Sequence, residues 1–339
     1  MAAAAEALWW TAADARRLTG DPSWPEALLG VPALVLDLRE RDDPGEPPPL
    51  RRAPCPVIAL LPADVQATWP VDLVLVADSP DVALLGGGLE AAASVLAARA
   101  AANPTAAATL ARLLRVTTDL EVGDALEVES LAYSMLLAGG EFRDWLQSRP
   151  PSRARADVGA DVVRTERRGG VLHVTLNRPE VHNAFNAAMR DALIETFTVA
   201  LADWSVGTIQ VDGNGPTFCS GGDLGEFGSA DDPARAHLVR TARSVGAAMH
   251  QLRDRLTVNV HGRCLGAGVE LPAFARRVVA ATGTTFRLPE VEMGLIPGAG
   301  GTVSLPRRIG AERTLLLALS GLALPVEDAL RWGLVDAIE

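Results

Sequence analysis

Three glycine-rich segments in the second half of the chain combine a flexible backbone with acidic side chains. They are TFCSGGDL (217–224), HGRCLGAGVEL (261–271) and LPEVEMGLIPGAGGT (288–302). Such segments lack bulky side chains, so the chain can approach a ligand closely. Each is also expected to open a helix, whose first N–H groups are free and point outward. We therefore expect these segments to form a ligand site.

The chemistry open to these segments is stabilisation of negative charge beside a proton transfer. Two backbone N–H groups from separate loops can converge on one carbonyl oxygen as an oxyanion hole, and loss of one donor typically costs a factor of about 10²–10³ in rate. Two carboxylates beside the same carbonyl can act as general acid and base. Glu270 and Glu290 are the candidate pair. The residues alone leave open whether they meet, because helix-start and loop carboxylates are often only structural.

Other chemistries find less support in the sequence. The five histidines show no HxxxH or HExxH spacing and the three cysteines no CxxC spacing, so we expect neither a metal site nor a disulfide framework. Ser220 with His261 as base would suit a hydrolase, but SGGD is not the G-x-S-x-G elbow of that class. We rank a hydrolase lower for that reason.

Length and composition describe the protein that must position these groups. The chain has 339 residues, enough for about two domains, and its 48% hydrophobic and 22% charged residues are typical of a globular protein. The net charge of −11 argues against a nucleic-acid partner. No apolar run approaches the roughly 18 residues that span a bilayer, and the N-terminus lacks a basic signal-peptide region, so we expect a cytoplasmic protein that enters no membrane.

The first half of the chain predicts strands followed by helices. Apolar β-branched runs predict strands at 31–38, 56–62 and 71–78, and helical spacing continues from 88 to 146, with a helix starting at Asn103-Pro104. The triplet Gly86, Gly88 and Ala91 has the spacing of a dinucleotide-binding turn. No acidic residue follows about 20 positions later, so we predict a simple turn before a helix.

A proline- and arginine-rich segment, 148–160, is the best candidate linker and divides the chain into residues 1–155 and 156–339. Beyond it, strands and helices alternate. The predicted elements are a hairpin over 162–179, a helix from Asn186 to about Trp204, strands at 208–211 and 257–260 with a helix over 232–252 between them, and strands at VVAAT and TFRLP.

Four ordered motifs in this second half resemble the crotonase superfamily of enoyl-CoA hydratases and isomerases. They are LNRPEVHNAFN, FCSGGDL, LGAGVEL and PEVEMGLIPGAGGT. The resemblance covers about residues 161–339. It implies an α/β fold in which a spiral of ββα units forms two nearly perpendicular sheets, preceded here by a smaller α/β or mostly helical N-terminal domain. It also implies a homo-oligomer, trimeric or hexameric.

The same resemblance implies roles for individual residues. The thioester oxygen of an acyl-CoA would accept hydrogen bonds from the backbone N–H groups of Gly222 and Ala267. Glu270 and Glu290 would flank the substrate, and the presence of both favours addition of water to a 2-enoyl-CoA. Coenzyme A enters as part of the substrate, and no further cofactor or metal is expected. The residues expected to contact the substrate or its CoA portion are Val181, His182, Ser220, Asp223 and Gly298.

The chain also departs from the family pattern. Family members usually continue into further helices after the motif found here as GLVDAI, whereas this chain ends at Glu339. We therefore hypothesise that residues 1–155 replace those helices as lid and oligomer contact. The chain has no lysine, so CoA phosphates would have to be met by arginine, for example Arg178. Alternative functions are an enoyl-CoA isomerase, a cofactor-free arylacetyl-CoA dioxygenase and a CoA-ester-binding scaffold.

Overall fold

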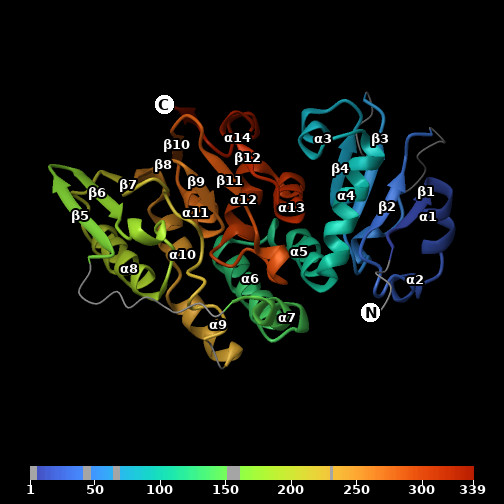
Figure 1. The fold of residues 1–339 in the computed structure, drawn as a ribbon, viewed down its shortest axis with the longest axis horizontal. Helices are drawn as coiled ribbons and strands as arrows, with labels where there is room; N and C mark the ends of the chain where they lie inside the picture. Colours follow the sequence, from blue (N-terminus) through green and yellow to red (C-terminus); the bar gives the residue numbers. More distant parts are fainter. Residues whose placement is uncertain (1–5, 41–46, 64–68, 151–160, 230–231) are drawn as a thin grey trace.

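The N-terminal part of the chain forms a parallel sheet. The computed structural model describes residues 6–40, 47–63, 69–150, 161–229 and 232–339. The sheet has the strand order β1 (Leu8–Thr11), β2 (Leu34–Asp37), β3 (Val57–Leu61) and β4 (Leu73–Val76), seen at one end of the molecule in Figure 1. Its last three strands confirm the predicted ones. β1 was not predicted, because its four residues are mostly exposed and form no buried apolar run.

Two further sheets make up the second half. The larger has the order β13-β10-β8-β7-β6-β5, and every neighbouring pair in it is parallel except the β5–β6 hairpin. Its strands are β5 (Val163–Arg168), β6 (Val171–Leu176), β7 (Thr208–Gly213), β8 (Leu256–Val260), β10 (Arg277–Ala280) and β13 (Ala337–Ile338). The smaller sheet contains β9 (Arg263–Leu265), β11 (Thr285–Arg287) and β12 (Leu324–Pro325). The predicted hairpin and strands are confirmed.

The helices of the second half follow the predictions with one correction. Asn186 caps α8 (Ala187–Ala202) through a hydrogen bond from the Met189 N–H to its side chain, 2.9 Å long. The single helix predicted over 232–252 is instead α9 (Pro233–Ala242) and α10 (Val245–Gln251). Ser244 causes the break, because its backbone is extended and its side chain caps α10 by accepting a hydrogen bond from Ala247 N.

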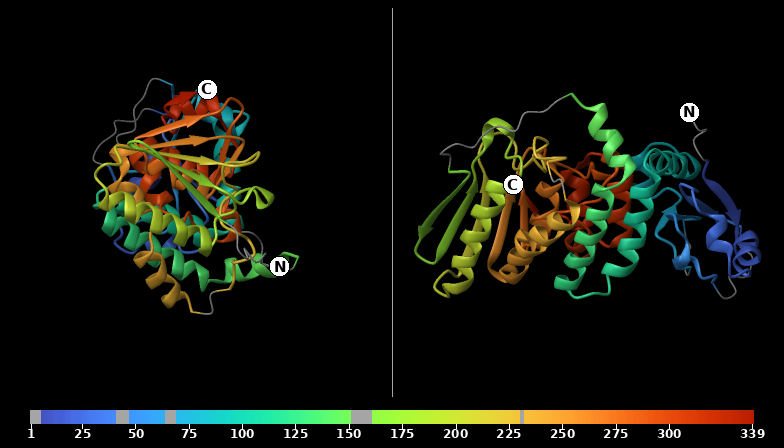
Figure 2. Two further views of the ribbon diagram at one scale, coloured as in Figure 1. Left: turned by 90° about the vertical axis from the view of Figure 1, so that its left-hand side faces the viewer. Right: turned by 90° about the horizontal axis from the view of Figure 1, so that it is seen from below.

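Helices of the first half pack directly on those that end the chain. The first-half helices include α4 (Leu89–Ala102), α5 (Pro104–Thr117), α6 (Val122–Leu137) and α7 (Gly140–Ser148). Of these, α5 contacts both α12 (Gly301–Ile309) and α13 (Ala311–Ser320), α4 contacts α13 and α6 contacts α12, and one hydrophobic core includes residues of both halves. Figures 1 and 2 show these helices between the N-terminal sheet and the sheets of the second half. The predicted linker falls largely on 151–160, outside the described residues, and the division at 155/156 stays a prediction.

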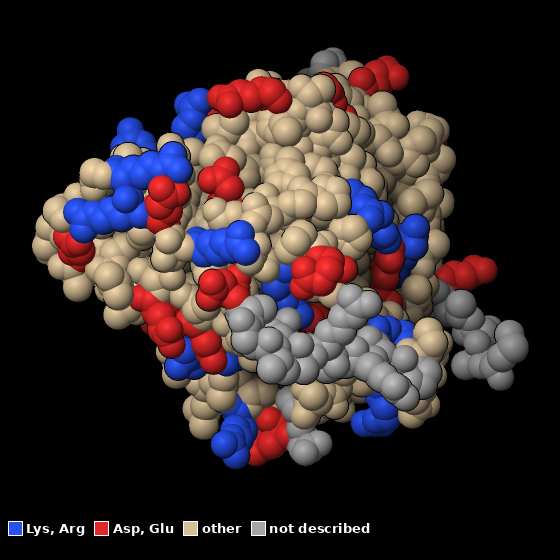
Figure 3. All heavy atoms as spheres, turned by 60° about the vertical axis from the view of Figure 1, so that its left-hand side comes forward, with Lys and Arg blue, Asp and Glu red and all other residues tan. Residues whose placement is uncertain are grey.

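Gly86 and Gly88, which have the spacing of a dinucleotide-binding turn with Ala91, lie between two helices. They join α3 (Pro80–Leu85) to α4, in which Ala91 lies, so no strand leads into the motif as a dinucleotide-binding turn requires. The remaining helices are α1 (Ala12–Thr19), α2 (Trp24–Ala27), α11 (Ala267–Glu270) and α14 (Val326–Trp332). Within the described residues, none of the helices is both long and apolar enough to cross a membrane. On the face shown in Figure 3, acidic and basic side chains are interspersed.

Candidate active site

Two short segments run side by side at the centre of the site. Cys219 pairs with Cys264 in a parallel bridge, and Leu265 N donates to the Cys219 carbonyl at 3.1 Å. Gly221 and Gly266 continue the two segments, with an added Cβ on Gly221 3.7 Å from the Cα of Gly266, and the next residues, Gly222 and Ala267, line one cavity. Among the described residues, neither of these two N–H groups donates a hydrogen bond within the protein. Two neighbouring amide donors are thus available to a ligand.

Glycine is required at the point where these segments meet the acidic groups. Gly221 and Gly266 have φ of +87° and +47°, a region that other residues rarely adopt. A Cβ atom on Gly266 would lie 2.4 Å from Oε1 of Glu290 and 3.5 Å from the Cα of Gly221. The missing side chain therefore lets the Glu290 carboxylate reach the backbone beside Ala267. Ala267 itself has a negative φ, so its methyl group causes no backbone strain.

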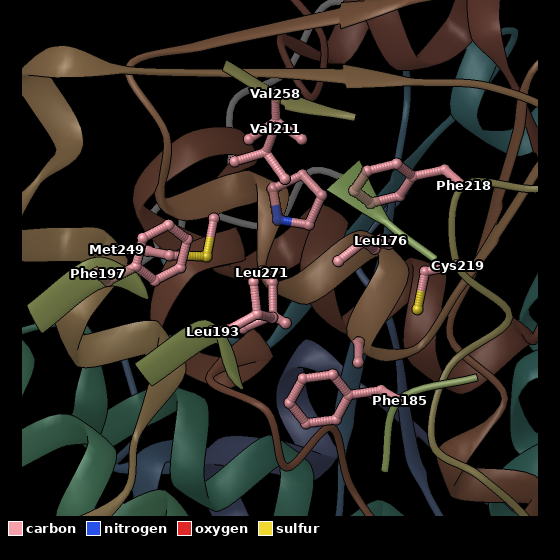
Figure 4. A pocket seen from close by; sticks show the side chains of 12 residues that line it. Leu176, Phe185, Leu193, Phe197, Val211, Phe218, Cys219, Met249, Val258 and Leu271 are labelled. Atoms are coloured by element: carbon pink, nitrogen blue, oxygen red, sulfur yellow. The ribbon is translucent and has the colours of Figure 1, made fainter. Parts of the chain in front are cut away.

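Apolar packing supports the two segments from behind. Figure 4 shows side chains such as Phe185, Phe218, Cys219 and Leu271 around a small cavity of about 20 Å³. Every side chain that lines this cavity is apolar or a thiol, and there is little room in it beyond that for one water molecule. We interpret it as part of the core that holds the amide donors in place, rather than as a substrate site.

A much larger cavity opens on the other side of the segments. Its volume is about 840 Å³, within the range of small-molecule sites. Five of the residues singled out in the sequence line it: Gly222, Ala267, Glu270, Glu290 and Gly298. The structure therefore brings the candidate amide donors and both candidate carboxylates to one cavity.

The two carboxylates are held in different ways. Glu270 is 2% exposed, and its Oε2 accepts hydrogen bonds from Ala299 N at 2.7 Å and Gly301 N at 2.9 Å. The Oε2 of Glu290 is buried and has no hydrogen-bond partner among the described residues. Burial raises the pKa of Glu290 to about 8. Burial, and next the charge of Glu290, raise the pKa of Glu270 well above its ordinary value. At neutral pH the pair therefore retains a proton, which it can supply as a general acid.

A third buried carboxylate, Glu129 of α6, was missed by sequence reasoning. It is 2% exposed and accepts hydrogen bonds from Gly300 N (2.8 Å), Thr302 N (2.9 Å) and Thr302 Oγ1 (2.7 Å). Burial raises its pKa to about 7. The Glu270 carboxylate accepts hydrogen bonds from the N–H groups of Ala299 and Gly301, and the Glu129 carboxylate accepts them from the N–H groups of Gly300 and Thr302. The two carboxylates together fix the turn that opens α12. The available signal was the position of Glu129 four residues after the buried Ala125, on the inner face of the helix.

Replacing Glu129 by alanine is expected to lower the free energy of unfolding by about 2–4 kcal/mol, because three buried donors lose their acceptor. Turnover should also fall, since the turn at 298–301 borders the cavity. Urea denaturation measures the first effect. Glu127→Ala is the matched control: Glu127 lies on the same helix, its side chain is half exposed, and its loss should change stability by less than about 1 kcal/mol. Equal urea midpoints for Glu129→Ala and the wild type would contradict this role.

Stability should fall as pH rises, because burial of their carboxyl groups raises the pKa of three glutamates. Glu129 and Glu290 have pKa values of about 7 and about 8, above the ordinary value of 4.5, and the pKa of Glu270 is also raised. Between pH 4.5 and 8 the folded state therefore binds more protons than the unfolded state, so the free energy of unfolding decreases as pH rises. Urea midpoints at pH 5.5 and pH 8 measure this. Glu290→Gln should stabilise the protein at pH 8 more than at pH 5.5, and a pH-independent effect would contradict the assignment.

The other expected substrate contacts lie together near the two segments but outside the cavity lining. Ser220 N donates to the His182 carbonyl at 3.0 Å, and Ser220 Oγ lies 3.4 Å from the Val181 carbonyl. Asp223 forms an ion pair with Arg178, with a shortest distance of 3.0 Å. Arg178 is only 1% exposed, so it serves the fold and is not placed to meet CoA phosphates as the sequence led us to consider.

The hydrolase alternative gains no support from the geometry. Ser220 and His261 do not contact each other: the His261 ring nitrogen Nε2 lies 2.9 Å from the Gly215 carbonyl oxygen. Cys219 is buried, and burial raises the pKa of its thiol to about 12, which keeps it protonated. In the described part of the chain, no group of three or more His, Cys, Asp or Glu side chains could hold a metal ion.

Comparison with known proteins identifies the family. The model of the enoyl-CoA hydratase/isomerase family matches residues 166–339, more than half of the chain. The chain therefore belongs to the enoyl-CoA hydratase/isomerase family, within the crotonase superfamily, as the motifs predicted. The α/β fold expected from the resemblance, with a further N-terminal region before the family domain, is confirmed as well.

Individual relatives carry both hydratase and isomerase names. The chain is 36% identical over 168 residues to the 2,3-dehydroadipyl-CoA hydratase of Escherichia coli K12, and 36% identical over 170 residues to the trans-2-decenoyl-[acyl-carrier-protein] isomerase of Streptococcus mutans. These matches cover 50% and 49% of this chain and 65% of each relative. A solved enoyl-CoA hydratase from Mycobacterium smegmatis is 30% identical, with 52% of this chain and 69% of that chain covered and a TM-score of 0.49.

Proposed function

We propose that the protein adds water across the Cα–Cβ double bond of 2-enoyl-CoA thioesters and catalyses the reverse dehydration. One observation carries this proposal: the unpaired amides of Gly222 and Ala267 and the buried carboxylates of Glu270 and Glu290 line the same cavity. The family membership of residues 166–339 supports it.

The amides act on the thioester oxygen. When water attacks Cβ, negative charge moves to the thioester carbonyl, and two amide donors fixed on adjacent segments stabilise that charge without reorganising. Gly222 and Ala267 are the donors in this proposal. Their positions are held by the apolar core around the small cavity and by the backbone β-bridge between Cys219 and Cys264.

The carboxylates move the protons. The ionised member of the Glu270–Glu290 pair takes a proton from the attacking water, the hydroxyl forms a bond to Cβ, and the protonated member gives its proton to Cα. One proton enters the pair and one leaves it, so the pair holds the same number of protons as before, now on the other carboxylate. Both carboxylates at one cavity favour hydration over the isomerase alternative, which commonly uses one.

The remaining assignments belong to the same proposal. Coenzyme A, as part of the substrate, would pass the backbone around Val181, His182, Ser220 and Asp223, and the reaction needs no further cofactor. The N-terminal helices would cover the acyl chain, since Glu129 and Tyr133 of α6 line the cavity. The resemblance to the crotonase superfamily implies a homo-oligomer, and we propose that this protein forms a trimer or hexamer.

Mixing the purified protein with crotonyl-CoA tests the proposal. Loss of the conjugated enoyl absorbance, with 3-hydroxybutanoyl-CoA as the product, is the expected result. Conversion of a 3-enoyl-CoA into a 2-enoyl-CoA without hydration would instead make the protein an isomerase. Oxygen uptake with an arylacetyl-CoA would make it a dioxygenase, and binding of several CoA esters without turnover would make it a scaffold.

A further inference from the structure

The wall of the cavity also contains a partly buried cation. The ring of Tyr133, on α6, packs against Gly298, where an added Cβ would lie 2.3 Å from ring atom Cδ2. The guanidinium of Arg240, on α9, lies 4.6 Å from the centroid of the same ring. Both side chains line the cavity that also contains Glu270 and Glu290. The Tyr133 ring therefore contacts both Arg240 and the turn at Gly298.

Arg240 has more donors than the protein uses. Its Nη1 donates to Ala236 O of its own helix at 3.1 Å, and its Nη2 donates to Ser134 Oγ at 3.0 Å. Its Nε is buried and has no partner, and among the described residues no carboxylate lies within 4.0 Å of it. A guanidinium has five N–H donors, and withdrawing part of a cation from water without an ion-pair partner is costly. An anion that entered the cavity would therefore stabilise Arg240.

Among the described residues, neighbouring acidic side chains form no ion pair with Arg240, and the charge of Glu129 acts on it only at longer range. Glu129 is occupied by the N–H groups at the start of α12, and Glu127 pairs with His237 at 3.0 Å. Arg243, a second arginine of the cavity wall, differs from Arg240 in having a counter-ion, since its Nε lies 2.7 Å from Asp191. Burial lowers the pKa of Arg240, but an arginine side chain stays charged at neutral pH.

We propose that Arg240 determines substrate specificity by binding a carboxylate at the far end of the acyl chain, so that the preferred substrates are CoA monothioesters of unsaturated dicarboxylic acids. This inference rests on the proposed function, because it takes the acyl group to extend from the amide donors past Tyr133. A guanidinium binds a carboxylate through two parallel hydrogen bonds, which an uncharged acyl end cannot accept. A simple fatty acyl chain would instead place a methyl group against the Arg240 cation and shield it further from water without pairing it.

A pair of matched substrates tests this: the CoA monothioester of trans-2-hexenedioic acid and trans-2-hexenoyl-CoA, which have the same number of acyl carbons. The wild type is expected to have a kcat/KM at least about 10-fold higher for the dicarboxylic substrate. Arg240→Met should lower that kcat/KM by about 100-fold, mainly through KM, and change the value for hexenoyl-CoA by less than about 3-fold. Arg243→Met is the matched control and should leave the ratio between the two substrates unchanged.

Calorimetric binding of the two saturated analogues, hexanedioyl mono-CoA and hexanoyl-CoA, separates this inference from the proposed function. If neither enoyl substrate is hydrated but the dicarboxylic analogue binds at least 10-fold tighter and loses that advantage in Arg240→Met, the specificity stands and the hydratase proposal fails. If the wild type hydrates both substrates equally and binds both analogues equally, the role of Arg240 is overturned. Equal losses for both ligands in Arg240→Met would also overturn it.

Discussion

Replacing Glu290 by glutamine is expected to lower kcat for enoyl-CoA hydration by about 10²–10⁴-fold without loss of the fold. Glutamine has nearly the same shape as glutamate but can neither take up nor release a proton at neutral pH. The Oε2 of Glu290 has no hydrogen-bond partner among the described residues, so the substitution breaks no contact of that atom. Steady-state rates with crotonyl-CoA, together with a circular-dichroism melt, measure both parts of the expectation.

Glu292→Gln is the matched control for this variant. Glu292 lies two residues further on but pairs with Arg287 at 2.7 Å and Arg99 at 3.4 Å, and it is not among the residues that line the cavity. Its substitution should leave kcat within about 2-fold of the wild type. Glu270→Gln should resemble Glu290→Gln, and the double variant should lose little more than either one, because the two carboxylates act as a unit. Wild-type turnover in both single variants would dismiss the acid–base pair.

Replacing Ala267 by proline is expected to lower kcat by at least about 10²–10³-fold, because it deletes one amide donor of the oxyanion hole. Ala267 is the first residue of α11, where proline is favoured because its N–H has no partner within the helix. The Ala267 carbonyl, which accepts a hydrogen bond from Leu271 N at 3.1 Å, is retained. The variant should therefore fold and bind CoA esters while losing most of its turnover.

Ala267→Gly controls for the change of side chain. It keeps the N–H group and removes only the methyl group, so its rate should stay within a few-fold of the wild type. If the proline variant turned over as fast as the glycine variant, the Ala267 amide would have no part in the reaction. Melting temperatures of both variants show whether the fold is intact.

Features that depend on local backbone chemistry were predictable from the sequence. The glycines at 221–222 and 266 and the acids that follow them indicated a ligand site, and the structure places Glu270 and Glu290 at one cavity. Apolar, β-branched runs predicted most strands. The prediction of a single helix over 232–252 was wrong because of a capping side chain: Ser244 caps a second helix, which begins at Val245.

Features that depend on distant partners were not predictable. Glu129 and Tyr133 lie on a helix of the first half whose sequence shows no sign of Gly298 or of the N–H groups of Gly300. Arg240 lies on a helix with several exposed residues, and it is partly buried where α6 packs on α9. Without a template for the first half, the wall of the acyl cavity could not be derived.

A crystal structure of the protein with butanoyl-CoA, which cannot be hydrated, tests the central claim most directly. The account expects the thioester oxygen within about 2.7–3.1 Å of the amide nitrogens of both Gly222 and Ala267, with Cα and Cβ facing Glu270 and Glu290. A thioester bound elsewhere, or an oxygen in contact with neither amide, would contradict it.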